Sequence, residues 1–209
     1  LFKLRFIYDP LTIYENVYKL LPGHIITFSD KGVKNTRWYN LLNYSQEEVN
    51  HSFITNNIRN YFDEAVKRRL VSDVDLGVFL SGGLDSSLIV ASIAEQGLKY
   101  PCFTMGFAGA SSYYEERPQA ASLAKYYGMQ HEELEIDETT VIKNIPEILG
   151  ACDEPFADTS AIPFYMLSKQ VSSNVKVVLS GDGGDEVFGG YRKHIGEKWS
   201  ALPFLIPKF

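Results

Sequence analysis

Cysteine is scarce in this sequence, which has only Cys102 and Cys152. Disulfide scaffolds and zinc sites need denser or more regularly spaced cysteines, so both classes are disfavoured. No signal peptide opens the sequence, and no apolar run reaches the roughly 18 residues of a membrane span. We therefore expect a cytoplasmic protein with two free, buried thiols and no membrane partner.

Positive charge is also scarce. Lys and Arg number 20 against 26 Asp and Glu, which gives a formal charge of −6 and a pI near 5.3. The one compact basic run, Lys67–Arg69, ends a predicted helix, where it complements the helix dipole. A nucleic-acid partner is therefore not expected. An acidic chain can still bind a nucleotide through backbone amides and a metal ion.

The first 45 residues predict short strands and turns rather than a self-standing domain. Apolar residues cluster at 2–7 and 25–28, and Pro22-Gly23 and Asp30–Gly32 are turn signals. Residues 40–45 have the composition of a linker. Because the chain begins with Leu1 rather than Met, we expect it to be a piece of a longer protein.

From residue 45 onward, strand and helix patterns alternate. Ser45 and Glu48 form a capping box before a helix predicted over 46–70. Strands are then predicted at 76–80, 102–107, 131–136 and 175–179, and helices at 86–96, 116–127, 139–151 and 161–171. This alternation predicts an α/β fold with a doubly wound, mostly parallel sheet of the Rossmann-like type. Such sheets bind ligands at the carboxyl ends of their strands.

The first predicted site is the loop Ser81–Ser87, between a buried strand and a helix. Its glycines allow a tight turn, and the N–H groups at the helix start favour phosphate. The hydroxyls of Ser81, Ser86 and Ser87 would add donors. The loop has neither the Walker A ending nor GxGxxG spacing, which disfavours kinase-type and dinucleotide sites. The alternative is a plain turn in which Asp85 complements the helix dipole.

The second predicted site is the stretch 180–191, in which three acidic residues stand among five glycines. Crowded carboxylates repel one another unless they share a cation. Because Asp85 and Asp185 both follow predicted strands, together they could hold Mg²⁺ on the phosphates of ATP. A solvated acidic loop is the alternative.

These motifs resemble a known family. SGGLDSS at 81–87 resembles the pyrophosphate-binding loop of the N-type ATP pyrophosphatases, with their adenine nucleotide alpha hydrolase-like fold. SGDGGDEVFGGY at 180–191 resembles the second signature of the asparagine synthetase family, and 153–158 a segment between the two loops. Residues 20–24 and 37–39 resemble the tail of its glutaminase domain. The resemblance divides the chain into a glutaminase tail and linker (1–45) and a truncated ATP-binding domain (46–209).

The resemblance implies that ATP activates aspartate as β-aspartyl-AMP, with release of pyrophosphate, and that ammonia then displaces AMP to give asparagine. It places Mg²⁺ on Asp85 and Asp185, the base that deprotonates ammonia at Asp182, and an aromatic residue near it at Tyr191. The residues that would contact ATP are Phe79, Leu80, Ser81, Gly82, Gly83, Asp85, Ser86, Ser87, Met105, Ser180 and Gly181. A β-lactam synthetase-like or sugar-modifying amidotransferase, or a non-catalytic nucleotide-binding domain, remains an alternative.

Two parts of the family's machinery are not found in the 209 residues. They are the N-terminal cysteine nucleophile of the glutaminase domain and a catalytic lysine well beyond the second loop; Lys193 and Lys198 are too close to that loop. We therefore expect the chain to bind MgATP but to turn over poorly, with glutamine hydrolysed by a glutaminase domain of the same parent chain. The oligomeric state stays open, a homodimer included.

Overall fold

The computed structural model describes residues 4–43, 50–109, 115–155, 157–194 and 196. The chain forms two compact units, one of residues 1–58 with 139–165, the other of 59–138 with 166–209. In the described ranges, no helix has the length and apolar character needed to cross a membrane. The predicted capping box at Ser45 and Glu48, and Lys198, lie outside these ranges.

The first unit contains an antiparallel hairpin of β1 (His24–Ser29) and β2 (Gly32–Arg37). Ser29 pairs with Gly32, so the turn lies at Asp30-Lys31, as predicted. Residues 4–7 form no strand, and a short 3₁₀ helix occupies Leu41–Asn43. The unit also includes most of α4 (Glu138–Gly150) and the first half of α5 (Ala161–Val171).

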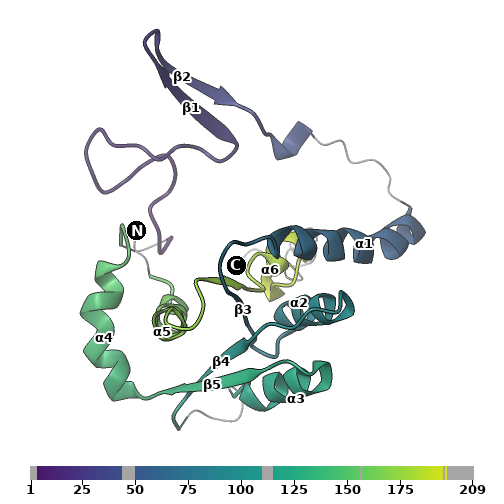
Figure 1. Ribbon diagram of the computed structural model, residues 1–209. Helices are drawn as coiled ribbons and strands as arrows, with labels where there is room; N and C mark the ends of the chain where they lie inside the picture. The colour runs from purple at the N-terminus through teal and green to yellow at the C-terminus, as the bar shows by residue number, and fades with distance from the viewer. Residues whose placement is uncertain (1–3, 44–49, 110–114, 156, 195, 197–209) are drawn as a thin grey trace, which may run out of the picture. The chain divides into compact units, whose positions relative to one another are not determined.

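The second unit is built on a parallel four-stranded sheet in the order β5-β4-β3-β6 (Figure 1). Its strands are β3 (Leu76–Phe79), β4 (Cys102–Phe107), β5 (His131–Ile136) and β6 (Val177–Leu179). Helix α1 (His51–Arg69) precedes β3, and α2 (Leu84–Glu95) and α3 (Arg117–Tyr127) connect the next strands. The predicted strands and helices are confirmed within about two residues at their ends, except at the start of α1. That helix was predicted from residue 46 but begins at His51; Asn50 is not helical, and residues 46–49 lie outside the described ranges.

The sheet is buried on both faces, which confirms the predicted doubly wound fold. Val78 and Leu80 pack in one apolar cluster with side chains of α2, α3 and the second half of α1. Phe79, which points the opposite way, packs in another cluster with Leu167 and Val171 of α5. Figure 1 shows α2 and α3 on one side of the strands and α5 on the other.

Two sequence expectations need correction. The stretch after β6 was expected to be a loop, but Gly184–Phe188 forms a short helix, α6. Its glycine content hides the helical turn, since glycine is a poor helix former. Both thiols were expected to be buried, yet only Cys102 is; burial raises the pKa of its thiol to about 11. Cys152 is half-buried, and neither cysteine forms a disulfide.

The α2 side chains in the first cluster are expected to determine stability. Ile93 is fully buried there, with no exposed surface. We expect Ile93→Ala to lower the free energy of unfolding by about 2–5 kcal/mol, because it removes methylene groups and leaves a cavity. Ile142→Ala on α4, where the side chain is 58% exposed, should cost well under half as much. Urea unfolding of both variants measures the difference, and equal losses would contradict the assigned core.

Candidate functional site

The two glycine-rich segments meet at the point where the strand order reverses. From β3 the chain continues to β4 and β5 on one side, and later returns to place β6 on the other. The register pairs Val78 with Leu179, so the segments that follow β3 and β6 leave adjacent strand ends. Ligands of open α/β sheets bind at such a switch point.

The first segment, residues 81–87, turns sharply from β3 into α2. Gly82 has φ +78°, and a Cβ atom there would lie 2.9 Å from Cβ of Gln119 and 3.1 Å from the backbone nitrogen of Ala120. Only glycine satisfies both the left-handed backbone and this close approach. Helix α2 begins at Leu84 with Gly83 as its N-cap and no side-chain cap. Its first-turn N–H groups have no acceptor inside the helix, which suits an anion.

The three serines of this segment hydrogen-bond within the segment itself. Ser86 Oγ accepts from the Ser81 backbone N–H at 3.2 Å and lies 3.0 Å from Ser81 Oγ. The Ser86 and Ser87 hydroxyls donate to the Gly83 carbonyl at 3.2 and 2.6 Å. Ser86 is only 5% exposed, whereas Ser81 is exposed. Ser86 therefore shapes the turn from inside.

The second segment, residues 180–191, packs two of its glycines, Gly181 and Gly184, directly on Asp85. A Cβ atom on Gly184 would lie 2.5 Å from both Cγ and Oδ2 of Asp85. At Gly181 it would lie 2.9 Å from the backbone nitrogen of Ser86 and 3.0 Å from Cβ of Asp85. The structure thus brings the Asp85 carboxylate next to Gly184, which directly precedes Asp185 in the sequence.

Asp85 and Asp185 offer oxygen ligands to a hard cation. The Asp185 carboxylate lies against Gly190, whose N–H donates to the Asp185 carbonyl at 3.0 Å. Among the described residues, neither aspartate forms a salt bridge, and no group of three metal-ligating side chains occurs. Two carboxylates that leave the remaining positions to phosphate oxygens and water are a typical Mg²⁺ environment. The side chains present therefore fit Mg²⁺ carried by a nucleotide.

Asp182 and Tyr191 have separate hydrogen-bond partners. Asp182 is exposed, and its Oδ2 accepts from the Ser180 hydroxyl at 2.7 Å. The Tyr191 hydroxyl donates to Glu186 Oε1 at 2.5 Å, which holds the pKa of Glu186 below its usual value. The Lys193 ammonium lies 4.5 Å from the centre of the Tyr191 ring, a cation–π contact.

Leu80 and Met105 were expected to contact adenosine. Leu80 directly follows β3, and Met105 lies on the neighbouring strand β4. Leu80 donates its N–H to the Phe103 carbonyl at 2.9 Å and ends the β3 side of the ladder. Met105 pairs with Leu134 of β5 and is partly buried against the cluster that contains Phe79. Their backbones thus reach the carboxyl edge of the sheet.

Arg117 at the same edge was not predicted as a site residue. Its guanidinium lies against Gly106 of β4, where an added Cβ atom would be 2.2 Å from Nε. It donates to Glu115 through Nε at 2.7 Å and to Glu135 through Nη1 at 2.6 Å, which raises its pKa. The sequence held one signal for this contact, because Gly106 lies inside a predicted strand. A glycine within a strand often marks a position where another group approaches the backbone closely.

Residues 153–158 belong to the first unit, as does Lys19, which hydrogen-bonds Glu154. Glu154 Oε1 accepts from Lys19 Nζ at 2.5 Å, and Lys19 also donates to the Ile7 carbonyl at 2.9 Å. The bond to Glu154 raises the pKa of Lys19. Phe156 lies outside the described residues. The link between Lys19 and this segment was missed because the two are far apart in sequence.

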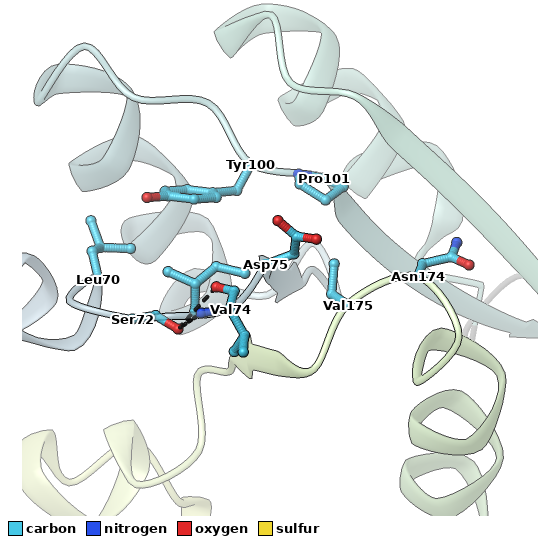
Figure 2. Close-up of a pocket in the computed structure, with 9 residues that line it drawn as sticks. Leu70, Ser72, Val74, Asp75, Tyr100, Pro101, Asn174 and Val175 are labelled. Carbon is cyan, nitrogen blue, oxygen red and sulfur yellow. Dashed lines mark hydrogen bonds between the residues drawn. The ribbon is translucent and has the colours of Figure 1, made fainter.

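A cavity of about 370 Å³ lies at the opposite, amino edge of the sheet (Figure 2). Figure 2 shows Tyr100 and Pro101, which precede β4, facing Asp75 and Val175, which precede β3 and β6. Leu70, Ser72, Val74, Leu76 and Asn174 complete the lining. This cavity is separate from the two glycine-rich segments, which follow the carboxyl ends of the strands.

A doubly wound parallel sheet with glycine-rich turns at its switch point is typical of α/β proteins that bind a ligand at the carboxyl edge of the sheet. A family model described as "Asparagine synthase" matches residues 57–206. The chain belongs to this family.

Curated relatives bear the same description. The chain is 36% identical over 212 residues to "Putative asparagine synthetase [glutamine-hydrolyzing] 2" of Methanocaldococcus jannaschii, covering 100% of this chain and 40% of the relative. It is 32% identical over 200 residues to "Asparagine synthetase [glutamine-hydrolyzing] 1" of Bacillus subtilis, covering 96% and 31%. The chain thus spans less than half the length of these two relatives.

Among solved structures, the fold is similar to a U34-tRNA thiolase, NcsA, from Methanococcus maripaludis, with a TM-score of 0.47 and 14% identity over 75% of this chain and 55% of that one. It is also similar to an NH₃-dependent NAD synthetase from Campylobacter jejuni, with a TM-score of 0.42 and 18% identity over 68% and 61%.

Proposed function

We propose that the protein of which this chain is part makes asparagine from aspartate by ATP-dependent amidation, with release of AMP and pyrophosphate. The observation that carries the proposal is the packing of Gly184 on Asp85, which joins the two glycine-rich segments into one site. Family membership supports the same reaction. The nitrogen would come from glutamine or ammonia.

The first segment would bind the pyrophosphate part of ATP. It contains the exposed Ser81 and the N–H groups of the first turn of α2, and it directly follows β3. Ser86 and Ser87 would hold the turn in shape, since their hydroxyls donate to the Gly83 carbonyl. Phe79, Leu80 and Met105 would present backbone groups to adenosine, with Ser180 and Gly181 opposite them.

Asp85 and Asp185 would hold the Mg²⁺ of MgATP. Bound there, the ion would neutralise charge on the phosphates and make pyrophosphate a better leaving group. The two carboxylates would also orient the nucleotide between the segments, because Gly181 and Gly184 have no Cβ atom and so admit the Asp85 side chain there. Asp182 would accept the proton of the attacking ammonia, with Tyr191 nearby.

In the parent protein, residues 1–45 would be the tail of a glutaminase domain and its linker, and residues 46–209 part of the ATP-binding domain. Glutamine hydrolysis would then take place in the glutaminase domain, with ammonia passed on to the second unit. A cytoplasmic location fits a biosynthetic enzyme of this kind, and a homodimer is compatible with it.

The test uses the full-length parent with MgATP, aspartate and ammonia, and resolves AMP, ADP, pyrophosphate and asparagine. We expect AMP and pyrophosphate in equal amounts, dependent on aspartate, with asparagine formed alongside. AMP release with another carboxylate only would point to a β-lactam synthetase-like or sugar-modifying relative. Formation of ADP, or binding of ATP without consumption, would overturn the proposal.

A further inference from the structure

Thr104 is a buried polar residue in the middle of the sheet. It lies on β4, is only 2% exposed, and has neighbouring strands on both sides. Its Oγ1 is 2.5 Å from the Leu80 carbonyl oxygen and 2.8 Å from Nε2 of His131 on β5. A buried hydroxyl requires hydrogen-bond partners, and here both come from the adjacent strands.

The chemistry of the three groups determines the direction of each hydrogen bond. A carbonyl oxygen only accepts, so the single proton of the Thr104 hydroxyl goes to Leu80. The His131 Nε2 must then carry a proton and donate it to Thr104 Oγ1. The His131 Nδ1 faces Glu133 Oε1 at 3.7 Å. The result is a relay from His131 through Thr104 to the last residue before the first glycine-rich segment.

The Leu80 carbonyl controls the start of that segment through the peptide plane. The carbonyl of Leu80 and the N–H of Ser81 belong to one planar peptide group. Thr104 holds the oxygen end of this plane, and Ser86 Oγ accepts from its N–H end at 3.2 Å. Rotation of the plane would break both bonds and reorient Ser81, whose Oγ also accepts from the Gly83 N–H at 3.2 Å.

We infer that Thr104 and His131 are positioning residues, which fix the Leu80–Ser81 peptide and thereby the conformation of the segment 81–87. Neither residue needs to touch the nucleotide. Their effect on nucleotide binding rests on the proposed function, in which this segment binds the pyrophosphate of ATP. Their effect on the conformation of the segment does not depend on that function.

The experiment compares Thr104→Val, which keeps the shape and removes the hydroxyl, with Thr104→Ser, which keeps the hydroxyl. His131→Leu and His131→Gln form a second pair, since glutamine retains an N–H donor. In the full-length parent, we expect Thr104→Val to raise KM for MgATP about tenfold, because the buried Leu80 carbonyl loses its partner. KM for aspartate should stay the same, and Thr104→Ser should restore the low KM for MgATP. The histidine pair should show the same contrast, more weakly.

Amide hydrogen exchange without nucleotide gives a second readout. Exchange at residues 81–87 should accelerate in Thr104→Val and not in Thr104→Ser, while β4 and β5 stay protected. Unchanged exchange at 81–87 in Thr104→Val would overturn the inference, whatever the kinetics show. If exchange at residues 81–87 is faster in Thr104→Val but the wild-type parent binds no MgATP, the relay is supported and the proposed function is overturned. Equal increases in KM for MgATP and aspartate would indicate general unfolding and overturn the positioning role.

Discussion

Asp85→Asn and Asp185→Asn are each expected to lower AMP formation by the full-length parent about a thousandfold. Both substitutions keep the size of the side chain and remove its charge, so the two segments can still pack together. What each variant loses is one of the two carboxylates that would hold Mg²⁺. In the described part of the chain, no salt bridge engages either aspartate, so their replacement breaks no ion pair that stabilises the fold.

A matched control is Asp73→Asn, because Asp73 is exposed in the turn before β3. It should leave AMP formation within about twofold of the wild type, as surface substitutions usually do. The second measurement is nucleotide affinity with Mg²⁺ and with a chelator. The wild type should bind MgATP more tightly than free ATP, and both variants should lose this preference. If Asp85→Asn and Asp185→Asn keep it, these aspartates are not the metal ligands.

Gly184→Ala is expected to lower kcat/KM for MgATP about a hundredfold, the usual cost of displacing a site group by about an ångström. The new methyl group would lie 2.5 Å from Cγ and Oδ2 of Asp85, so that carboxylate must move. Helix propensity alone gives the opposite expectation, since alanine favours helix and Gly184 is the first residue of α6. We expect the steric contact with Asp85 to outweigh helix propensity, so that Gly184→Ala lowers kcat/KM.

Gly150→Ala is the matched control, because Gly150 ends α4 and an added Cβ atom there meets nothing within 4 Å. It should leave kcat/KM unchanged. Thermal unfolding of both variants separates a local effect from a loss of fold; Gly184→Ala should cost no more than about 1–3 kcal/mol, the usual range for overpacking. Normal activity in Gly184→Ala would show that the second segment does not pack on Asp85 in the working enzyme.

The regular elements could be predicted because each has a local signal. Strand β4 and helix α5 match their predicted bounds, and both are apolar segments bounded by turn residues. Helix α6 could not be predicted, since Gly183 and Gly184 lower the helix propensity of the stretch in which the turn forms. The identity of the two glycine-rich segments was also readable in the sequence, because their residue types and order are themselves the motif.

By itself, the sequence determined the α/β class, the order of strands and helices, and the two glycine-rich segments that we propose bind MgATP. Only the tertiary structure decided that β6 lies beside β3, which places Asp85 against Gly184. The same holds for the relay of His131, Thr104 and Leu80 and for Arg117 on Gly106. Local patterns report which face of a strand or helix is buried, but contacts between distant residues depend on strand order and close packing, which no local pattern encodes.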